Sequence, residues 1–139
     1  MPFIIEIFPS DRLVIQTFFG DITLEENKKA HAELVSHPDY DDRFCGVTDF
    51  RRAKKVYSKD EIREIQKDAE SIDLKSRWCS LELNPKNTAL ALLFNSTLEC
   101  SSKHSVFTTV DEASAFLQKP DLPKCIRSIS DTHPEIGSL

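Results

Sequence analysis

Three capping boxes set the framework of this chain, because each one predicts where a helix begins. In such a box a Ser or Thr stands three residues before a Glu, as in Thr23 with Glu26, Ser58 with Glu61 and Thr109 with Glu112. The hydroxyl accepts a hydrogen bond from the third helical N–H, and the carboxylate accepts one from the N–H of the Ser or Thr. Asn84–Pro85 indicates a fourth helix start, since Asn caps well and Pro fits the first helical position.

Short apolar runs precede these helix starts and have the composition of β-strands. Residues 3–8 and 12–19 are rich in β-branched and aromatic side chains. The turn residues 9–11 between them predict an antiparallel hairpin. Further strands are expected at residues 44–50, 78–83 and 105–108. Residues 87–94 fit either a strand or a helix, and a helix is preferred because the apolar spacing continues to Leu98.

The resulting order is β-β-α-β-α-β-α-β-α. It predicts an α/β fold with a mostly parallel sheet, one antiparallel edge and helices covering the sheet. One domain is expected over residues 1–119. The tail, residues 120–139, is rich in proline but also holds Cys125, Ile126 and Ile129. It is expected to be loosely ordered, or to pack on this domain or on a partner.

Helical spacing also predicts which side chains face inward. In the first helix the inward residues are expected to be Leu24, Asn27, His31, Leu34 and Val35. Asn27 and His31 are the polar members of this set, and they are candidates for a polar pocket. The second helix has a narrow apolar seam, which consists of Ile62, Ile65, Ala69 and Ile72.

Composition excludes several classes of protein. The chain has 139 residues, with 18 Lys and Arg against 23 Asp and Glu and a net charge of −5, so nucleic acid is not an expected partner. No apolar run approaches the roughly 20 residues that span a bilayer, and the N-terminus lacks a signal-peptide pattern, so a cytoplasmic location is expected. The four cysteines are scattered and are expected to be reduced thiols.

The fold and several local motifs resemble the STAS-like domain, the fold of bacterial anti-sigma-factor antagonists, and in particular a branch of small uncharacterised bacterial proteins. The similarity covers roughly residues 3–118. The segments that carry it are 18–26, 37–41, 47–51 and 106–113. In the antagonists a serine at the start of the helix after the third strand is phosphorylated by an anti-sigma-factor kinase, which switches binding. Here residues 49–53 hold no Ser or Thr, and the nearest hydroxyl is that of the N-cap Ser58.

The segment from Asp49 to Ser58 is the main candidate site, because open α/β sheets place ligands beyond the carboxyl ends of their strands. Its candidate residues for binding a partner or ligand are Asp49, Arg51, Arg52, Lys54, Lys55, Tyr57 and Ser58. Its cations fit an anionic ligand or partner surface; the alternative is a solvated loop with local ion pairs. Cys45 is interpreted as a buried, inert thiol rather than a nucleophile. Residues 39–42 form a polar loop rather than a calcium site, because Arg43 and Phe44 stand where an EF-hand needs an oxygen ligand and Gly.

No nucleophile, base and orienting residue can be assembled from the sequence, and neither a metal-ligand spacing nor a glycine-rich phosphate loop is present. We therefore expect a non-enzymatic regulatory or scaffold module, without cofactor or metal, that binds another protein through residues 49–58 and the adjoining helix. The alternative is a carrier or sensor of a small apolar or anionic ligand. A homodimer is also expected, with Ile126 and Ile129 or the seam of the second helix as its apolar contact.

Overall fold

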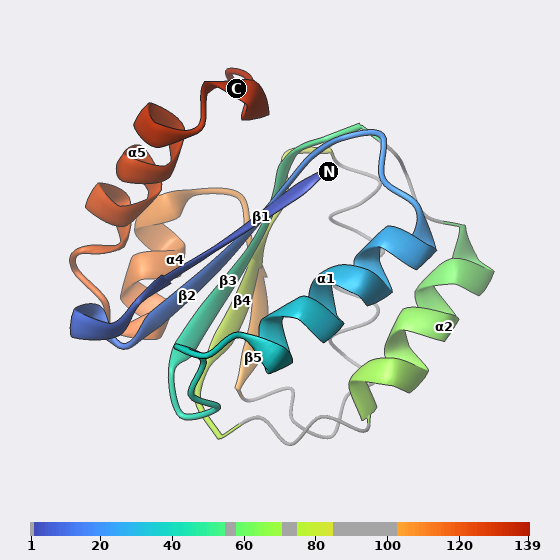
Figure 1. Cartoon of the computed structure of the whole chain (residues 1–139), viewed down its shortest axis with the longest axis horizontal. Coiled ribbons are helices and arrows are strands. Elements are labelled where there is room, and N and C mark those ends of the chain that lie inside the picture. Colours follow the sequence, from blue (N-terminus) through green and yellow to red (C-terminus); the bar gives the residue numbers. More distant parts are fainter. Residues whose placement is uncertain (1, 55–57, 71–74, 85–102) are drawn as a thin grey trace.

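The structure is a computed structural model that describes residues 2–54, 58–70, 75–84 and 103–139 (Figure 1). A five-stranded sheet forms its centre. In chain order the elements are β1 (Phe3–Phe8), β2 (Leu13–Gly20), α1 (Leu24–Ser36), β3 (Cys45–Ala53), α2 (Lys59–Glu70), β4 (Trp78–Leu81), β5 (His104–Phe107), α4 (Val110–Leu117) and α5 (Leu122–Thr132). Short 3-10 turns cover Pro9–Asp11 and Pro134–Ile136.

The sheet has the predicted mixed character. Its strand order is β1-β2-β3-β4-β5; β1 is antiparallel to β2, and the other neighbours are parallel. The hairpin pairs Phe3 with Phe18 and Phe8 with Leu13. Arg12 closes its turn with a left-handed backbone, φ 52°. The α/β class, the opening hairpin and the antiparallel edge are therefore confirmed.

Helices cover both faces of the sheet (Figure 1). The crossovers β2-α1-β3 and β3-α2-β4 advance in the same direction along the sheet. Since such connections are right-handed, their helices lie on the same face. The helices α4 and α5 follow the last strand and cover the opposite face. Each face has its own hydrophobic cluster, the larger between the sheet and the pair α4 and α5, the smaller between the sheet and α1.

A close approach between β3 and β4 explains why residue 46 is a glycine. The Trp78 ring lies over Gly46, where a Cβ atom would come within 2.1 Å of it. The indole N–H donates to Thr48 Oγ1 at 2.8 Å. The Thr48 hydroxyl reaches Gln16 Oε1 at 3.4 Å, and Gln16 Nε2 reaches the Ala30 carbonyl at 3.5 Å. This chain of contacts satisfies the buried Gln16 amide and ties α1 to the middle of the sheet.

The predicted inward face of α1 is partly wrong. The helix spans Leu24–Ser36 and has the capping box at Thr23, both as predicted, but its buried residues are Ala30 and Leu34. His31 is exposed, and so is Val35 at 52%. The buried stripe lies about one residue away from the predicted one, because the small Ala30 allows the close approach to Gln16.

The largest difference from the predicted elements is a helix in the tail, residues 120–139. Residues Leu122–Thr132 form α5, which packs on this domain's own sheet. Its buried residues are Leu122, Cys125, Ile126 and Ile129, and Ile136 is buried beyond them. Ile126 and Ile129 are therefore part of the intramolecular core. As buried residues they offer no exposed apolar contact between copies, and dimerisation itself stays a prediction.

The remaining predictions concern the end of β4, two helix starts and segments that lie outside the described residues. Strand β4 ends at Leu81, so that Leu83 lies beyond it and is 51% exposed. The capping box at Ser58 forms. At Thr109 the hydroxyl accepts from the Glu112 N–H at 3.3 Å, as predicted, but it is this hydroxyl that donates to the Glu112 carboxylate, at 2.8 Å. The expected helix over 85–98, the alternative strand at 87–94 and the seam side chains of the second helix lie outside the described residues and side chains. Within the described part of the chain, no helix has the length and apolarity needed to cross a bilayer.

Candidate functional site

The carboxyl end of β3 holds a buried ion pair at the predicted site. Asp49 is 1% exposed. Its Oδ1 accepts bonds from the backbone N–H of Arg51 at 3.0 Å and from Arg51 Nε at 2.9 Å. Its Oδ2 accepts from Arg51 Nη2, also at 2.9 Å. Two parallel N–H···O bonds are the strongest geometry for a guanidinium and a carboxylate, so the pair fixes the end of the strand.

Arg52 extends this pair to the C-terminal segment. Its Nη1 lies 3.7 Å from Asp49 Oδ2. Its Nε donates to the Gly137 carbonyl at 2.9 Å, and its Nη2 donates to Ser130 Oγ at 3.2 Å. Burial lowers the pKa of Arg52, and the Asp49 charge opposes that effect. Asp49, Arg51 and Arg52, hereafter the β3 triad, thus join β3 to α5 and the residues beyond it.

A register shift in the β2–β3 ladder explains why two consecutive arginines both meet Asp49. Thr17 pairs with Asp49, but Phe19 pairs with Arg52, so β3 has one residue more than β2 at this point. Such a bulge re-aims side chains at the end of a strand. Sequence spacing alone places Arg51 and Arg52 on opposite faces, and the sequence has no signal for the bulge.

The predicted binding residues therefore separate into two groups. The side chains of Arg51 and Arg52 are only 8% and 7% exposed, and they pair with Asp49 inside the fold. Lys54 and Ser58 are exposed. The Ser58 hydroxyl accepts a bond from the Glu61 N–H at 3.2 Å, as an N-cap does. Lys55 and Tyr57 lie outside the described residues. Binding by these residues stays a prediction.

The remaining cations of this region lie along the outer face of α2. Lys59, Arg63 and Lys67 are all exposed, and they follow one another at intervals of four residues. Residues four apart are neighbours on a helix surface, so the three form a continuous row. Arg63 lies 3.7 Å from Asp60, and Glu64, beside the row, pairs with Lys28 of α1 at 2.9 Å. We call Lys59, Arg63 and Lys67 the α2 basic row.

Glu82 is a functional candidate that sequence reasoning missed. It follows β4 and is 5% exposed, and its Oε2 has no hydrogen-bond partner among the residues that the structure describes. Its backbone N–H donates to the Phe107 carbonyl at 3.0 Å. Burial, with a smaller contribution from the Asp49 charge, raises the pKa of Glu82 to about 7. In the strand predicted over residues 78–83, side chains alternate between the two faces, so Glu82 lies on the face opposite Cys79 and Leu81, and the pattern gives no sign of its burial.

The second predicted site, a polar pocket at Asn27 and His31, does not form as expected. Asn27 is half-buried on α1, whereas His31 is exposed, one residue beyond the buried Ala30. The two side chains therefore do not share an inward face. In the loop after α1, the Asp41 carboxylate accepts hydrogen bonds from Nε and Nη2 of Arg43, at 3.1 and 2.8 Å. This agrees with the predicted polar loop at residues 39–42.

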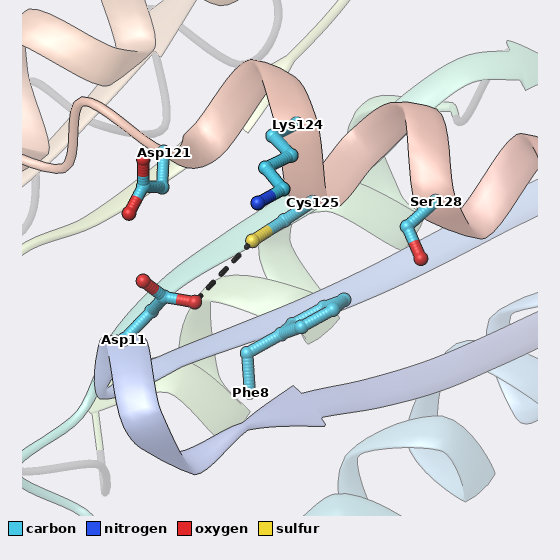
Figure 2. A pocket seen from close by; sticks show the side chains of 6 residues that line it. All are labelled: Phe8, Asp11, Asp121, Lys124, Cys125 and Ser128. Carbon is cyan, nitrogen blue, oxygen red and sulfur yellow. Dashed lines mark hydrogen bonds between the residues drawn. The ribbon is translucent and has the colours of Figure 1, made fainter.

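A small open cavity lies between the hairpin turn and the start of α5 (Figure 2). Its volume is about 160 Å³, and its lining residues are Phe8, Asp11, Asp121, Lys124, Cys125 and Ser128. Pockets that hold drug-sized ligands measure roughly 300–1,000 Å³, so this one suits only a very small molecule. Cys125 Sγ lies 3.7 Å from Asp11 Oδ2, and burial together with the Asp11 carboxylate raises the pKa of the thiol to about 11.

The thiols described by the structure have the properties of core residues rather than nucleophiles. Cys79 is fully buried, and burial raises its pKa to about 12. Cys45 is half-buried at the edge of the larger cluster. A thiol with a raised pKa carries almost no thiolate at neutral pH and reacts slowly. Among the described residues, no group of three or more His, Cys, Asp or Glu side chains could hold a metal ion.

Comparison with known proteins adds no assignment. No protein-family model matches this chain, and a search of curated proteins finds no match. The function must therefore be argued from the β3 triad and the surface beside it.

Proposed function

We propose that this domain is a non-enzymatic regulatory or scaffold module that binds an acidic surface of another protein through the α2 basic row. The row is the observation that carries the proposal. Its cations point to solvent at one-turn intervals, although the chain as a whole has a net charge of −5. A partner with a complementary acidic surface gains both faster association and a defined orientation.

The cost of the row supports a role in binding. Like charges four residues apart destabilise a helix by about 0.2–0.5 kcal/mol per pair. Asp60 lies 3.7 Å from Arg63 and offsets part of this repulsion. Glu64 pairs with Lys28 of α1. α2 also carries five acidic residues, but none of them interrupts the succession of Lys59, Arg63 and Lys67, and a row of cations along one line of a helix favours contact with an acidic surface.

The β3 triad gives this surface a fixed base. Because Arg51 and Arg52 pair inside the fold, the exposed cation nearest the strand end is Lys54. The buried pair holds the backbone just before the segment that leads into α2. Binding through a pre-positioned helix avoids part of the ordering cost that a flexible loop would incur.

The STAS-like assignment belongs to the same proposal. What supports it is the fold class alone, an α/β domain whose mixed sheet has one antiparallel pair. In the antagonist proteins of that family the helix after the third strand carries the switch for protein binding, and α2 follows the third strand here. The corresponding turn lacks a phosphorylatable residue, so we propose binding without that phospho-switch.

The test is a charge reversal on α2 with a matched control. The variant K59E/R63E/K67E reverses the row, and K29E/K124E/R127E reverses three exposed cations on α1 and α5 with the same change in net charge. Proteins retained from host lysate are quantified for the parent and both variants. We expect at least one partner retained by the parent and the control to be reduced about tenfold with the α2 variant.

Salt dependence provides an independent measurement. Binding through the row should weaken steeply between low and physiological ionic strength, because exposed charges are screened over about 8–10 Å. Circular dichroism of both triple variants verifies that they remain folded. A partner that binds the parent and both variants equally, or no partner above background, would contradict the proposal.

A further inference from the structure

Among the described residues, the outer edge of β1 pairs with no other strand. β1 is the first strand in the order of the sheet, and β2 is its only neighbour among the described strands. The Phe19 N–H donates to the Pro2 carbonyl at 2.9 Å, which fixes the alternation of the ladder. Residues at even positions therefore direct their backbone groups toward β2. The N–H and C=O groups of Phe3, Ile5 and Ile7 consequently point away from the sheet.

This edge is also open in space. Figure 1 shows β1 as the nearest element to the viewer, with α1 and α2 to one side and α4 and α5 to the other. No described helix or strand crosses in front of it. Ile4, Ile5 and Ile7 are half-buried, so part of each apolar side chain remains at the surface beside the open edge.

The usual protections against edge pairing are missing from β1. Native edge strands are blunted by lysine, proline, bulges or shortness. β1 has six residues, contains neither lysine nor proline, and pairs with β2 in an unbroken register. Its one charged residue, Glu6, binds His133 at 2.9 Å on the α5 face. The opposite edge strand, β5, has four residues.

The edge is complementary to itself. When two copies of β1 run antiparallel with Ile5 opposite its counterpart, Phe3 stands opposite Ile7 and the outward groups of both strands form hydrogen-bonded pairs. The side chains that meet on the α1 face are then all apolar. On the other face Glu6 stands opposite Ile4 rather than another Glu6, which avoids a like-charge contact. Pro2 and Pro9 end the pairing at both sides.

From these observations we propose that β1 is the interface between two copies of this chain. The copies are related by a two-fold axis through Ile5, and their sheets join into one continuous sheet. A two-fold contact places the same surface on both partners, and only a self-complementary register satisfies it. The inference is independent of the α2 basic row, which lies on another element.

The test compares a variant at the edge with a matched variant elsewhere. Ile7→Lys places a charge beside Phe3 of the other copy, and Ile7 belongs to neither hydrophobic cluster. Val35→Lys makes the same chemical change on the exposed surface of α1. Sedimentation equilibrium of the parent should show a species of twice the 15.9 kDa chain mass. We expect Ile7→Lys to raise the dimer dissociation constant about tenfold or more, with Val35→Lys unchanged.

Two further measurements keep the inference testable if Ile7→Lys folds poorly. Ile7→Pro removes an outward N–H that the β1–β2 ladder does not use, and it should also weaken the dimer. In the parent, hydrogen exchange at the amides of Phe3, Ile5 and Ile7 should slow as protein concentration rises. A monomer at millimolar concentration, or a dimer insensitive to both Ile7 variants, overturns the proposal. Protection of these amides only by an extended peptide of another protein also overturns it.

Discussion

At the scale of single residues, the buried Glu82 leads to the most specific prediction about how stability depends on pH. The residue is 5% exposed, one carboxyl oxygen has no partner in the described part of the chain, and burial raises the pKa of the carboxyl group from 4.5 to about 7. The folded chain therefore binds this proton more tightly than the unfolded chain. The resulting stabilisation is complete below about pH 4.5 and is lost as the pH rises to about 7.

Glu82→Gln should remove this dependence, because an amide resembles the protonated acid at every pH. We expect the free energy of unfolding of the variant, relative to the parent, to rise by up to about 3 kcal/mol between pH 4 and pH 8. Urea unfolding at a series of pH values measures it. Glu25→Gln, at an exposed position of α1, is the control. A constant difference between Glu82→Gln and the parent would show that Glu82 ionises normally.

At the scale of elements, the features predicted correctly are those that depend on residues close together in the chain, and the features missed depend on contacts between elements. The helix starts at Thr23, Ser58 and Thr109 are confirmed, because a capping box depends only on residues three apart. The inward face of α1 was placed wrongly, because the deciding contact joins Ala30 to Gln16 of another element. The burial of the β3 triad could not be predicted for the same reason, since it depends on a bulge and on a partner segment near Gly137.

The corrected face of α1 leads to a paired prediction. Ala30 is 1% exposed against the sheet, so Ala30→Leu should push the helix away and cost about 1–3 kcal/mol of stability. Val35 is 52% exposed, so Val35→Ala should change stability by less than about 0.5 kcal/mol. Thermal or urea unfolding of both variants decides the matter. The reverse order of effects would support the face expected from the sequence.

At the scale of the whole molecule, the two ends of the chain meet at His133. Its Nε2 lies 2.9 Å from Glu6 of β1, and its Nδ1 lies 3.1 Å from Glu135. Ionised carboxylates only accept hydrogen bonds, so both contacts together require the doubly protonated ring. The hydrogen bond to Glu6 is the largest cause of the raised pKa of His133, and Glu135 adds to it. At pH values below its raised pKa, the protonated His133 thus holds the C-terminal segment to the first strand.

The pH dependence of the whole fold combines this contact with two buried groups. Burial lowers the pKa of His104 from 6.5 to about 4, so His104 adds stability as the pH rises from 4 to 6.5. Glu82 loses a similar amount over nearly the same range, and the two effects largely cancel. Above pH 6.5 His104 contributes no further change. Between pH 6.5 and pH 9 the expected decline then comes from both Glu82, whose pKa is about 7, and His133, whose pKa is raised.

Replacing His133 measures the part of that decline in stability that the histidine contributes. The raised pKa means that its stabilisation is complete below about pH 6.5 and is lost as the pH rises through the folded-state pKa. His133→Gln should therefore be less stable than the parent at pH 6, and the difference should shrink toward pH 9. His31→Gln makes the same replacement at an exposed position of α1 and should leave the parent's profile unchanged. Urea unfolding across this range measures both. If His133→Gln shows the same decline as the parent above pH 6.5, the ring is not the group that fastens the C-terminal segment to β1, and the contacts of Arg52 with Ser130 and Gly137, together with the buried Ile136, hold that segment.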